Sequence, residues 1–183
     1  ENITYVELSG VKGNPEIDLV YKGIELCREN DLDFILAVGG GSVIDTAKAI
    51  SVGVPYEKDV WDFYLRKDKP KTALPIGTVL TVVGAGSEMS MSNVITKADE
   101  KLKRDFDNPV IIPKFSILNP ESTFSVSAYQ TACGSYDALS HVMERYFTLV
   151  EHTDVTDRLC EGLMKLKAAR FLNGAKNIRK NQQ

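Results

Sequence analysis

The chain is poor in the residues that mark several common classes of protein. Its 183 residues include three cysteines, two histidines and one tryptophan. The cysteines are scattered and lack CxxC spacing, so they are expected to be free thiols in a reducing compartment. No apolar run reaches the roughly 20 residues that a membrane-spanning helix needs. The chain begins with Glu1 rather than Met and shows no secretory signal. These absences favour a soluble, cytoplasmic protein.

A surplus of charge of one sign is also absent. The 22 Lys and Arg residues nearly balance the 25 Asp and Glu residues, which leaves a formal net charge of −3. Because no basic block occurs, we expect neither a nucleic-acid surface nor a membrane surface. The hydrophobic content of 43% suffices for one good core, or for one domain and part of another.

The most informative feature that is present is a strand-like run that leads directly into a glycine-rich turn. Apolar residues 34–38 are followed by Gly39, Gly40 and Gly41, and Ser42 stands where it would cap a helix over 43–54. Glycines allow backbone amides to approach an anion, and a helix N-terminus attracts phosphate. The alternative is a tight left-handed connection without a ligand. The strand before and the helix after favour phosphate binding.

Strands and helices alternate along the first part of the chain. A strand over 3–8, a helix over 16–30 and the strand over 34–38 precede the helix after the glycines, which is the βαβ pattern of a parallel sheet. The pattern further predicts a short surface helix over 60–65, a strand over 72–76, a Gly/Ser/Thr-rich loop over 78–87, a hairpin of 91–96 with 103–106, and extended segments over 110–112 and 115–118.

The character of the sequence changes near Pro120. Long helical patterns over 126–150 and 154–172 contain few glycines, so we expect an α/β domain over 1–119 and a helical domain over 120–183. The apolar faces of these helices, which include Leu159, Leu163 and Leu166, need a partner. We therefore expect either an exposed apolar face or a partner chain, as in a homodimer.

Two residues of the helical part have the spacing of metal ligands. Asp137 and His141 are four residues apart and so share one face of the predicted helix. A carboxylate and an imidazole can hold Zn²⁺ or Fe²⁺ together, although such a pair also serves as an ordinary helix-stabilising contact. The small neighbours Ala132 and Gly134 predict a closely packed, buried helix, in which an ionisable pair needs compensation.

Three segments resemble, in order, the iron-containing (group III) alcohol dehydrogenases, and in particular their butanol-dehydrogenase-like branch. They are Gly39–Lys48, Thr81–Glu88 and Asp137–His141. The glycerol dehydrogenases are less similar, because they usually have Lys where Ser42 stands. The resemblance implies an α/β, dehydroquinate-synthase-like fold, in which a parallel-sheet nucleotide-binding domain is followed by an all-helical metal-binding domain.

The resemblance also implies NAD or NADP as cofactor and one metal ion, Fe²⁺ or Zn²⁺. The implied cofactor contacts are Gly40, Gly41 and Ser42 at the pyrophosphate, Asp45 near the nicotinamide, Thr81 and Ser87 along the adenosine or the phosphates, and Asn14 and Lys103 at ribose. Asp137 and His141 match the first two of four metal ligands. For Asp45, the residues alone leave open a capping box with Ser42.

The chain departs from the family pattern in several places. Val82 and Ala85 replace threonines, which removes two hydroxyls near the cofactor. The opening βα unit and the last two metal-binding histidines of the family would lie outside this chain. The implied reaction is hydride transfer between NAD(P) and a small primary alcohol or aldehyde. The alternatives are a catalytically inert nucleotide-binding fragment and a glycerol-dehydrogenase-like polyol oxidoreductase.

Overall fold

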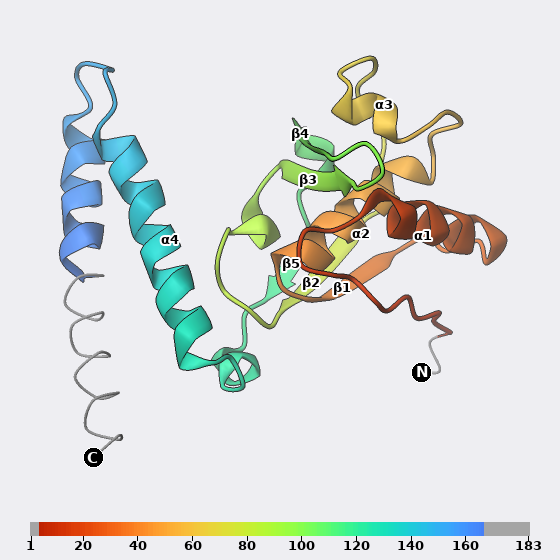
Figure 1. Cartoon of the computed structure of the whole chain (residues 1–183), viewed down its shortest axis with the longest axis horizontal. Coiled ribbons are helices and arrows are strands. Elements are labelled where there is room, and N and C mark those ends of the chain that lie inside the picture. Colours follow the sequence, from red (N-terminus) through yellow and green to blue (C-terminus); the bar gives the residue numbers. More distant parts are fainter. Residues whose placement is uncertain (1–3, 167–183) are drawn as a thin grey trace. The chain divides into compact units, whose positions relative to one another are not determined.

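The computed structural model describes residues 4–166 (Figure 1). The chain divides into two compact units, Glu1–Phe124 and Ser125–Gln183, which are treated separately below. Within residues 4–166, no helix is long and apolar enough to cross a membrane.

The first unit is built on a three-stranded parallel sheet. Strands β1 (Ile35–Gly39), β2 (Ile76–Leu80) and β5 (Phe115–Ile117) lie in the order β1-β2-β5. The β1–β2 ladder runs from the pair Ile35 and Ile76 to the pair Gly39 and Leu80. Helix α2 (Gly41–Gly53) crosses over between β1 and β2, as parallel strands require. The predicted parallel sheet is therefore confirmed.

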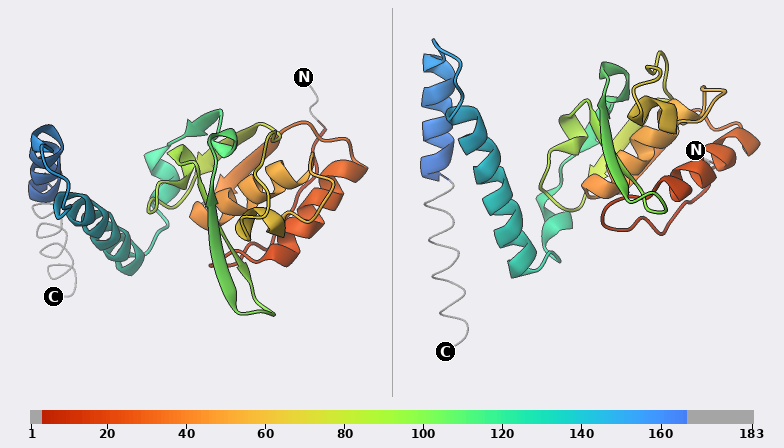
Figure 2. Two further views of the ribbon diagram at one scale, coloured as in Figure 1. Left: turned by 90° about the horizontal axis from the view of Figure 1, so that it is seen from above. Right: turned by 45° about the horizontal axis from the view of Figure 1, so that its top comes forward.

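Helix α2 covers one face of this sheet, and a further helix and a hairpin pack against α2 (Figure 2). Helix α1 (Ile17–Glu29) packs against α2, and β3 (Ser92–Lys97) pairs with β4 (Leu102–Asp107) in the predicted antiparallel hairpin. The remaining elements of the unit are short: α3 (Trp61–Tyr64) and the 3₁₀ turns η1 (Ser87–Met89), η2 (Pro109–Ile111) and η3 (Pro120–Thr123).

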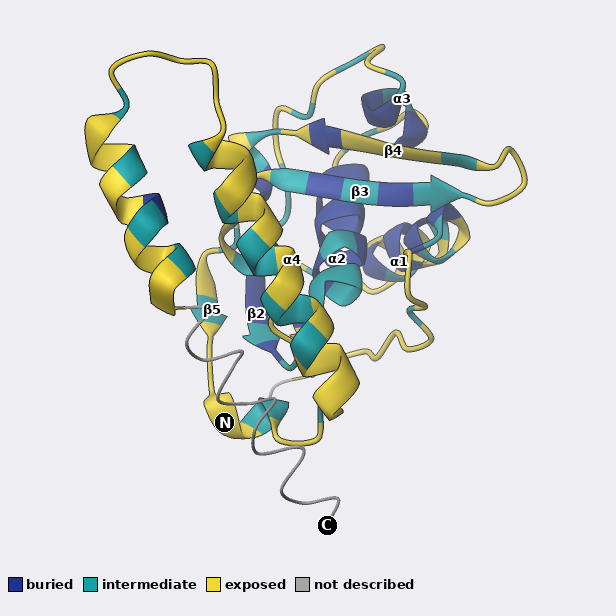
Figure 3. Cartoon of the chain, turned by 60° about the vertical axis from the view of Figure 1, so that its left-hand side comes forward, coloured by how far each residue is buried: buried dark blue, intermediate teal, exposed yellow. Residues whose placement is uncertain are grey.

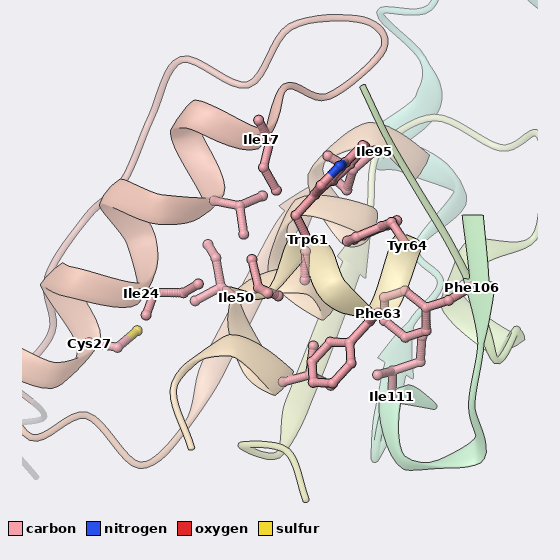
Figure 4. Packing of buried hydrophobic residues seen from close by; sticks show 14 residues of the cluster. Ile17, Ile24, Cys27, Ile50, Trp61, Phe63, Tyr64, Ile95, Phe106 and Ile111 are labelled. Carbon is pink, nitrogen blue, oxygen red and sulfur yellow. The ribbon is translucent and has the colours of Figure 1, made fainter. Parts of the chain in front are cut away.

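The main core of this unit joins α1, α2 and α3 to the hairpin. Ile24 of α1, Ile50 of α2 and Phe106 of β4 belong to one buried cluster with the aromatic residues of α3 (Figure 4). The rings of Trp61 and Tyr64 stack with their centroids 4.9 Å apart. The prediction of a surface helix here is wrong, because its aromatic side chains supply much of the core.

Helix α2 lies between this core and the sheet, so it is buried nearly all round (Figure 3). Ile44 and Ala47 pack against Ala37 and Ile76 of the sheet. The opposite face of the sheet is apolar but exposed in the described residues, as at Leu36, Val38, Phe115 and Ile117.

Two predicted strands and one predicted extended segment differ from the structure. Residues 4–8 of the expected first strand form no ladder. The expected strand over 72–76 begins only at Ile76 and continues to Leu80 by pairing with β1, and the Phe115 ring lies so close to Gly77 that a Cβ there would clash. Val110 and Ile111 are not extended, because Asn108 accepts a hydrogen bond from the Val110 N–H and opens the turn η2, whereas Ile112 is extended.

The second unit contains α4 (Ala128–Tyr146) and a helix over 154–166. The Ser127 hydroxyl accepts a hydrogen bond from the Gln130 N–H and caps α4. None of the residues of α4 is buried, so the expectation of a closely packed, buried helix is wrong. The exposed apolar face predicted for the following helix is confirmed, since Leu159, Leu163 and Leu166 are 64%, 47% and 52% exposed. Residues 167–172 of that predicted helix lie outside the described residues.

Candidate functional site

The glycine turn stands at the carboxyl end of β1, where ligands commonly bind in parallel sheets. Its glycines serve different purposes. A Cβ on Gly39 would lie 2.5 Å from Val43 Cγ2, so this glycine permits close packing of strand and helix. A Cβ on Gly41 would meet no atom within 4 Å. The fold therefore does not demand a glycine at position 41, and the open space above it suits an approaching anion.

The left-handed alternative for this turn is wrong, because none of the three glycines has a positive φ. The prediction that Ser42 caps α2 is also wrong. Gly40 is the N-cap, without a side-chain cap, and Ser42 lies within the first turn. The first helical hydrogen bonds are donated by the Val43 and Ile44 N–H groups to the Gly40 carbonyl. The N–H groups of Gly41 and Ser42 precede them, which leaves donors at the positive end of the helix for an anion.

The second Gly/Ser/Thr-rich loop lies beside this turn. The Thr81 N–H donates to the Gly39 carbonyl over 3.0 Å, and the Val82 side chain lies next to Gly40. Thr81 is half-buried, whereas the following residues 82–85 are exposed. The ladder between β1 and β2 thus brings the two segments with predicted cofactor contacts to one edge of the sheet.

Asp45 and Ser87 come together from the two segments. The Ser87 hydroxyl donates to Asp45 Oδ1 over 2.7 Å, and the Val94 N–H donates to Asp45 Oδ2 over 3.3 Å. The carboxylate of Asp45 is thus held by β3 and η1, rather than completing a capping box with Ser42. Burial raises the pKa of Asp45, whereas the Ser87 hydrogen bond and the charge of Lys48 oppose this rise.

Two hydrogen bonds in sequence hold the backbone carbonyl of Asp45. The Tyr64 hydroxyl donates to Asn93 Oδ1, and Asn93 Nδ2 donates to the Asp45 carbonyl. Tyr64 and Asn93 are both essentially inaccessible. Sequence reasoning gave neither a role, because their partners lie 29 and 48 residues away in the chain.

Lys48 was likewise assigned no role from the sequence. It is fully buried, and its ammonium donates to the carbonyls of Ser87, Ser90 and Ser92. Burial lowers the pKa of Lys48 to about 8, against the opposing charges of Asp45 and Glu88. The sequence does contain an indication that Lys48 is unusual, since it is the only charged residue between positions 46 and 56. A lone charge in such a run must find compensation if it is buried.

Asn14 and Lys103 also come together, although 89 residues separate them. Lys103 Nζ donates to Asn14 Oδ1 over 2.8 Å. The contact arises because the Thr96 N–H of β3 donates to the Pro15 carbonyl, which places the segment after Asn14 beside the hairpin. Lys103 is exposed, as its position in a charge run suggests, but its ammonium has a defined partner. The charge of Lys103 also opposes the rise that burial causes in the pKa of Asp45.

The turn fits a dinucleotide phosphate by its own geometry. Uncapped N–H donors, an open Gly41 and adjacent hydroxyl, carboxylate and ammonium groups suit a pyrophosphate flanked by polar sugar groups. The carboxyl end of β1 therefore offers backbone donors that suit a phosphate, with the Asp45 and Ser87 side chains beside them.

The predicted metal pair lies in the second unit, on α4. His141 Nε2 lies 3.6 Å from Asp137 Oδ2, so the predicted shared helix face is confirmed. The two side chains are 59% and 54% exposed, which contradicts the expected burial. Residues 4–166 contain no cluster of three or more His, Cys, Asp or Glu side chains that could hold a metal ion. The pair fits the donor chemistry of iron or zinc but supplies only two ligands.

Comparison with known proteins gives a consistent result. The family model described as "Iron-containing alcohol dehydrogenase" matches residues 1–120. The chain is 46% identical over 177 residues to "Probable NADH-dependent butanol dehydrogenase 1" of Bacillus subtilis, and the match covers 95% of this chain and 46% of that protein. The chain thus spans less than half the length of this curated relative.

Solved structures agree with the sequence comparison. The NADH-dependent butanol dehydrogenase A of Thermotoga maritima superposes with a TM-score of 0.82 and 37% identity, over 91% of this chain and 43% of that one. Sulfoacetaldehyde reductase from Bifidobacterium kashiwanohense, solved in complex with NAD⁺, gives a TM-score of 0.72 and 29% identity, over 76% of this chain and 37% of that one. These likenesses confirm the predicted dehydroquinate-synthase-like α/β fold.

Proposed function

The chain belongs to the iron-containing alcohol dehydrogenase family, and on that premise we propose that it forms the dinucleotide-binding part of an NAD(P)-dependent oxidoreductase. The proposed reaction is hydride transfer between the cofactor and a small primary alcohol or aldehyde of the butanol type. Residues 1–119 would form the nucleotide-binding domain, and residues 120–183 would begin a helical metal-binding domain.

The observation that carries this proposal is the pairing of an open Gly41 with uncapped N–H donors at the start of α2. The backbone of Gly40, Gly41 and Ser42 would hold the pyrophosphate. Backbone donors would hold the phosphate without a side chain, so the site would bind it despite the loss of the family threonines at Val82 and Ala85.

The remaining contacts would orient the two ends of the cofactor. The ammonium of Lys103, held by Asn14, retains donors for a ribose hydroxyl. The Asp45 carboxylate would accept a hydrogen bond from the nicotinamide end, and Thr81 and Ser87 would line the adenosine side or the phosphates. No residue of this set is assigned as a general acid or base.

A bound nicotinamide ring would supply the hydride acceptor or donor, and a bound metal would supply a Lewis acid for the alcohol oxygen. Asp137 and His141 would contribute two ligands to that metal. A homodimer and a cytoplasmic location remain part of the proposal, the former because the helix over 154–166 exposes an apolar face.

The proposal is tested by calorimetric titration of the purified chain with NADH and with NADPH. The informative variant is Gly41→Leu, because a Cβ at this position meets no protein atom within 4 Å and the side chain would enter the open space above the turn. Gly162→Leu is the matched control, since that glycine also lies in a helix with nothing within 4 Å of its Cβ. We expect Gly41→Leu to weaken binding about tenfold or more, a loss of at least about 1.4 kcal/mol, and the control to bind as the wild type. Equal affinity of both variants would contradict the proposal.

A further inference from the structure

Lys48 occupies an unusual position for a lysine, because its ammonium is enclosed by oxygen atoms of one short segment. Its Nζ donates to the Ser87 carbonyl over 2.7 Å, the Ser90 carbonyl over 2.8 Å and the Ser92 carbonyl over 2.9 Å. It also lies 3.1 Å from Ser87 Oγ. The three N–H donors of the ammonium are therefore used within residues 87–92, and the side chain has no accessible surface.

The backbone of residues 87–92 curves around the Lys48 ammonium, so that three of its carbonyl oxygens point to one cation. Three carbonyl oxygens that converge within six residues would repel one another in a buried site unless a positive group lay between them. Hydrogen bonds from a charged donor are also stronger than those from neutral groups. Two neutral contacts hold the segment from elsewhere: Ser116 Oγ donates to the Glu88 carbonyl, and the Asn108 N–H donates to the Met91 carbonyl. Among these donors to the carbonyls of the segment, Lys48 is the one that carries charge, while the Asp45 carboxylate accepts from the Ser87 hydroxyl.

The same contacts fix two predicted cofactor residues. The hydroxyl of Ser87 donates to Asp45 and accepts from Lys48, so its rotation is determined by both partners. Asp45 and Lys48 are three residues apart on α2, whose first turn carries the open Gly41. One buried side chain thus couples the loop that contains Ser87 to the helix that would bind the pyrophosphate.

We propose that Lys48 is a positioning residue for dinucleotide binding, which holds residues 87–92 so that Ser87 and Asp45 face the cofactor. The inference rests on the proposed function of the glycine turn. Lys48 is buried and would act through residues 87–92, without touching the cofactor itself. Loss of the charge would leave the sheet and the phosphate turn in place while residues 87–92 change conformation.

The first test compares the wild-type chain with Lys48→Met, which keeps most of the side-chain volume and removes the charge. We expect the affinity for NADH to fall about tenfold, as for the loss of one charge-assisted hydrogen bond. Amide hydrogen exchange should become faster in residues 87–92 and stay unchanged in β1 and β2. Unchanged affinity and unchanged exchange in a folded variant would overturn the proposal.

A second measurement follows the wild type as the pH is raised, with folded Lys48→Met as its control. The pKa of Lys48 is lowered by burial to about 8, so raising the pH from 7 to 9.5 removes its charge. The charged groups that act on it are Asp45 on α2 and Glu88 on η1, and Lys103 acts on Asp45 from β4. A neutral amine has two N–H donors for four oxygens. NADH affinity of the wild type should therefore fall across this range, and the profile of Lys48→Met should be flat.

The outcomes separate the two proposals. If the wild type does not bind NADH at pH 7, the proposed function fails. If the wild type binds NADH with an affinity that is independent of pH, and Lys48→Met binds equally well, the role of Lys48 fails while the proposed function stands.

Discussion

Gly39 packs closely against Val43, whereas Gly41 faces open space, and this difference leads to a quantitative prediction for Gly39→Ala. The new Cβ would lie 2.5 Å from Val43 Cγ2 and 2.7 Å from Val43 Cβ. Val43 is β-branched and sits in the first turn of a helix, where its rotamer is nearly fixed, so it cannot swing away. Overpacking of this kind costs about 1–3 kcal/mol. The free energy of unfolding should fall by this amount.

Urea unfolding followed by fluorescence measures the effect, because Trp61 is the only tryptophan and is buried in the first unit. The control is Gly41→Ala, which meets no atom and should be neutral or stabilising by up to about 1 kcal/mol. Adding Val43→Ala to Gly39→Ala removes the closest contact but leaves the 2.7 Å approach. The double variant should therefore recover part of the loss, with a coupling of about 0.5–2 kcal/mol. Wild-type stability of Gly39→Ala would refute the packing argument.

The remaining predictions concern the buried network and turnover. Tyr64→Phe should lower the free energy of unfolding by about 1–3 kcal/mol, because it leaves the buried acceptor of Asn93 without a donor; urea unfolding checks this against Tyr129→Phe, whose ring is 74% exposed. The chain should not oxidise NADH with butyraldehyde, even with added Fe²⁺ or Zn²⁺, because within residues 4–166 no third His, Cys, Asp or Glu side chain joins Asp137 and His141, whereas catalytic zinc sites have three ligands from protein. Metal-dependent turnover would show that this reasoning is wrong, and a comparison of butanol with glycerol would then identify the substrate class.

Local patterns predicted the parts of the fold that depend on neighbours in sequence. Helix α1 and the β3–β4 hairpin follow from apolar periodicity and alternation within short stretches. The position of β2 was missed because it depends on a distant residue. The predicted strand ends at Ile76, but Gly77 continues it by pairing with Leu36 and Phe115 of the neighbouring strands, and the Phe115 ring leaves no room for a side chain there.

The candidate site shows the same limit. The glycine motif predicted a phosphate site, yet Ser42 is the second residue of the helix, because Gly40 is the N-cap. The pairing of Lys103 with Asn14 and the cage around Lys48 arise from hydrogen bonds across 89 and up to 44 residues. No local pattern encodes such contacts, and only the isolated charge of Lys48 gave a hint of them.

The central claim is that the open turn at the start of α2 binds a nicotinamide dinucleotide. Calorimetric titration of the wild-type chain with NADH, repeated with Gly41→Leu, tests it most directly. The account predicts one saturable site per chain that Gly41→Leu weakens about tenfold or more. Absence of binding by the wild type, or equal binding by Gly41→Leu, would contradict it.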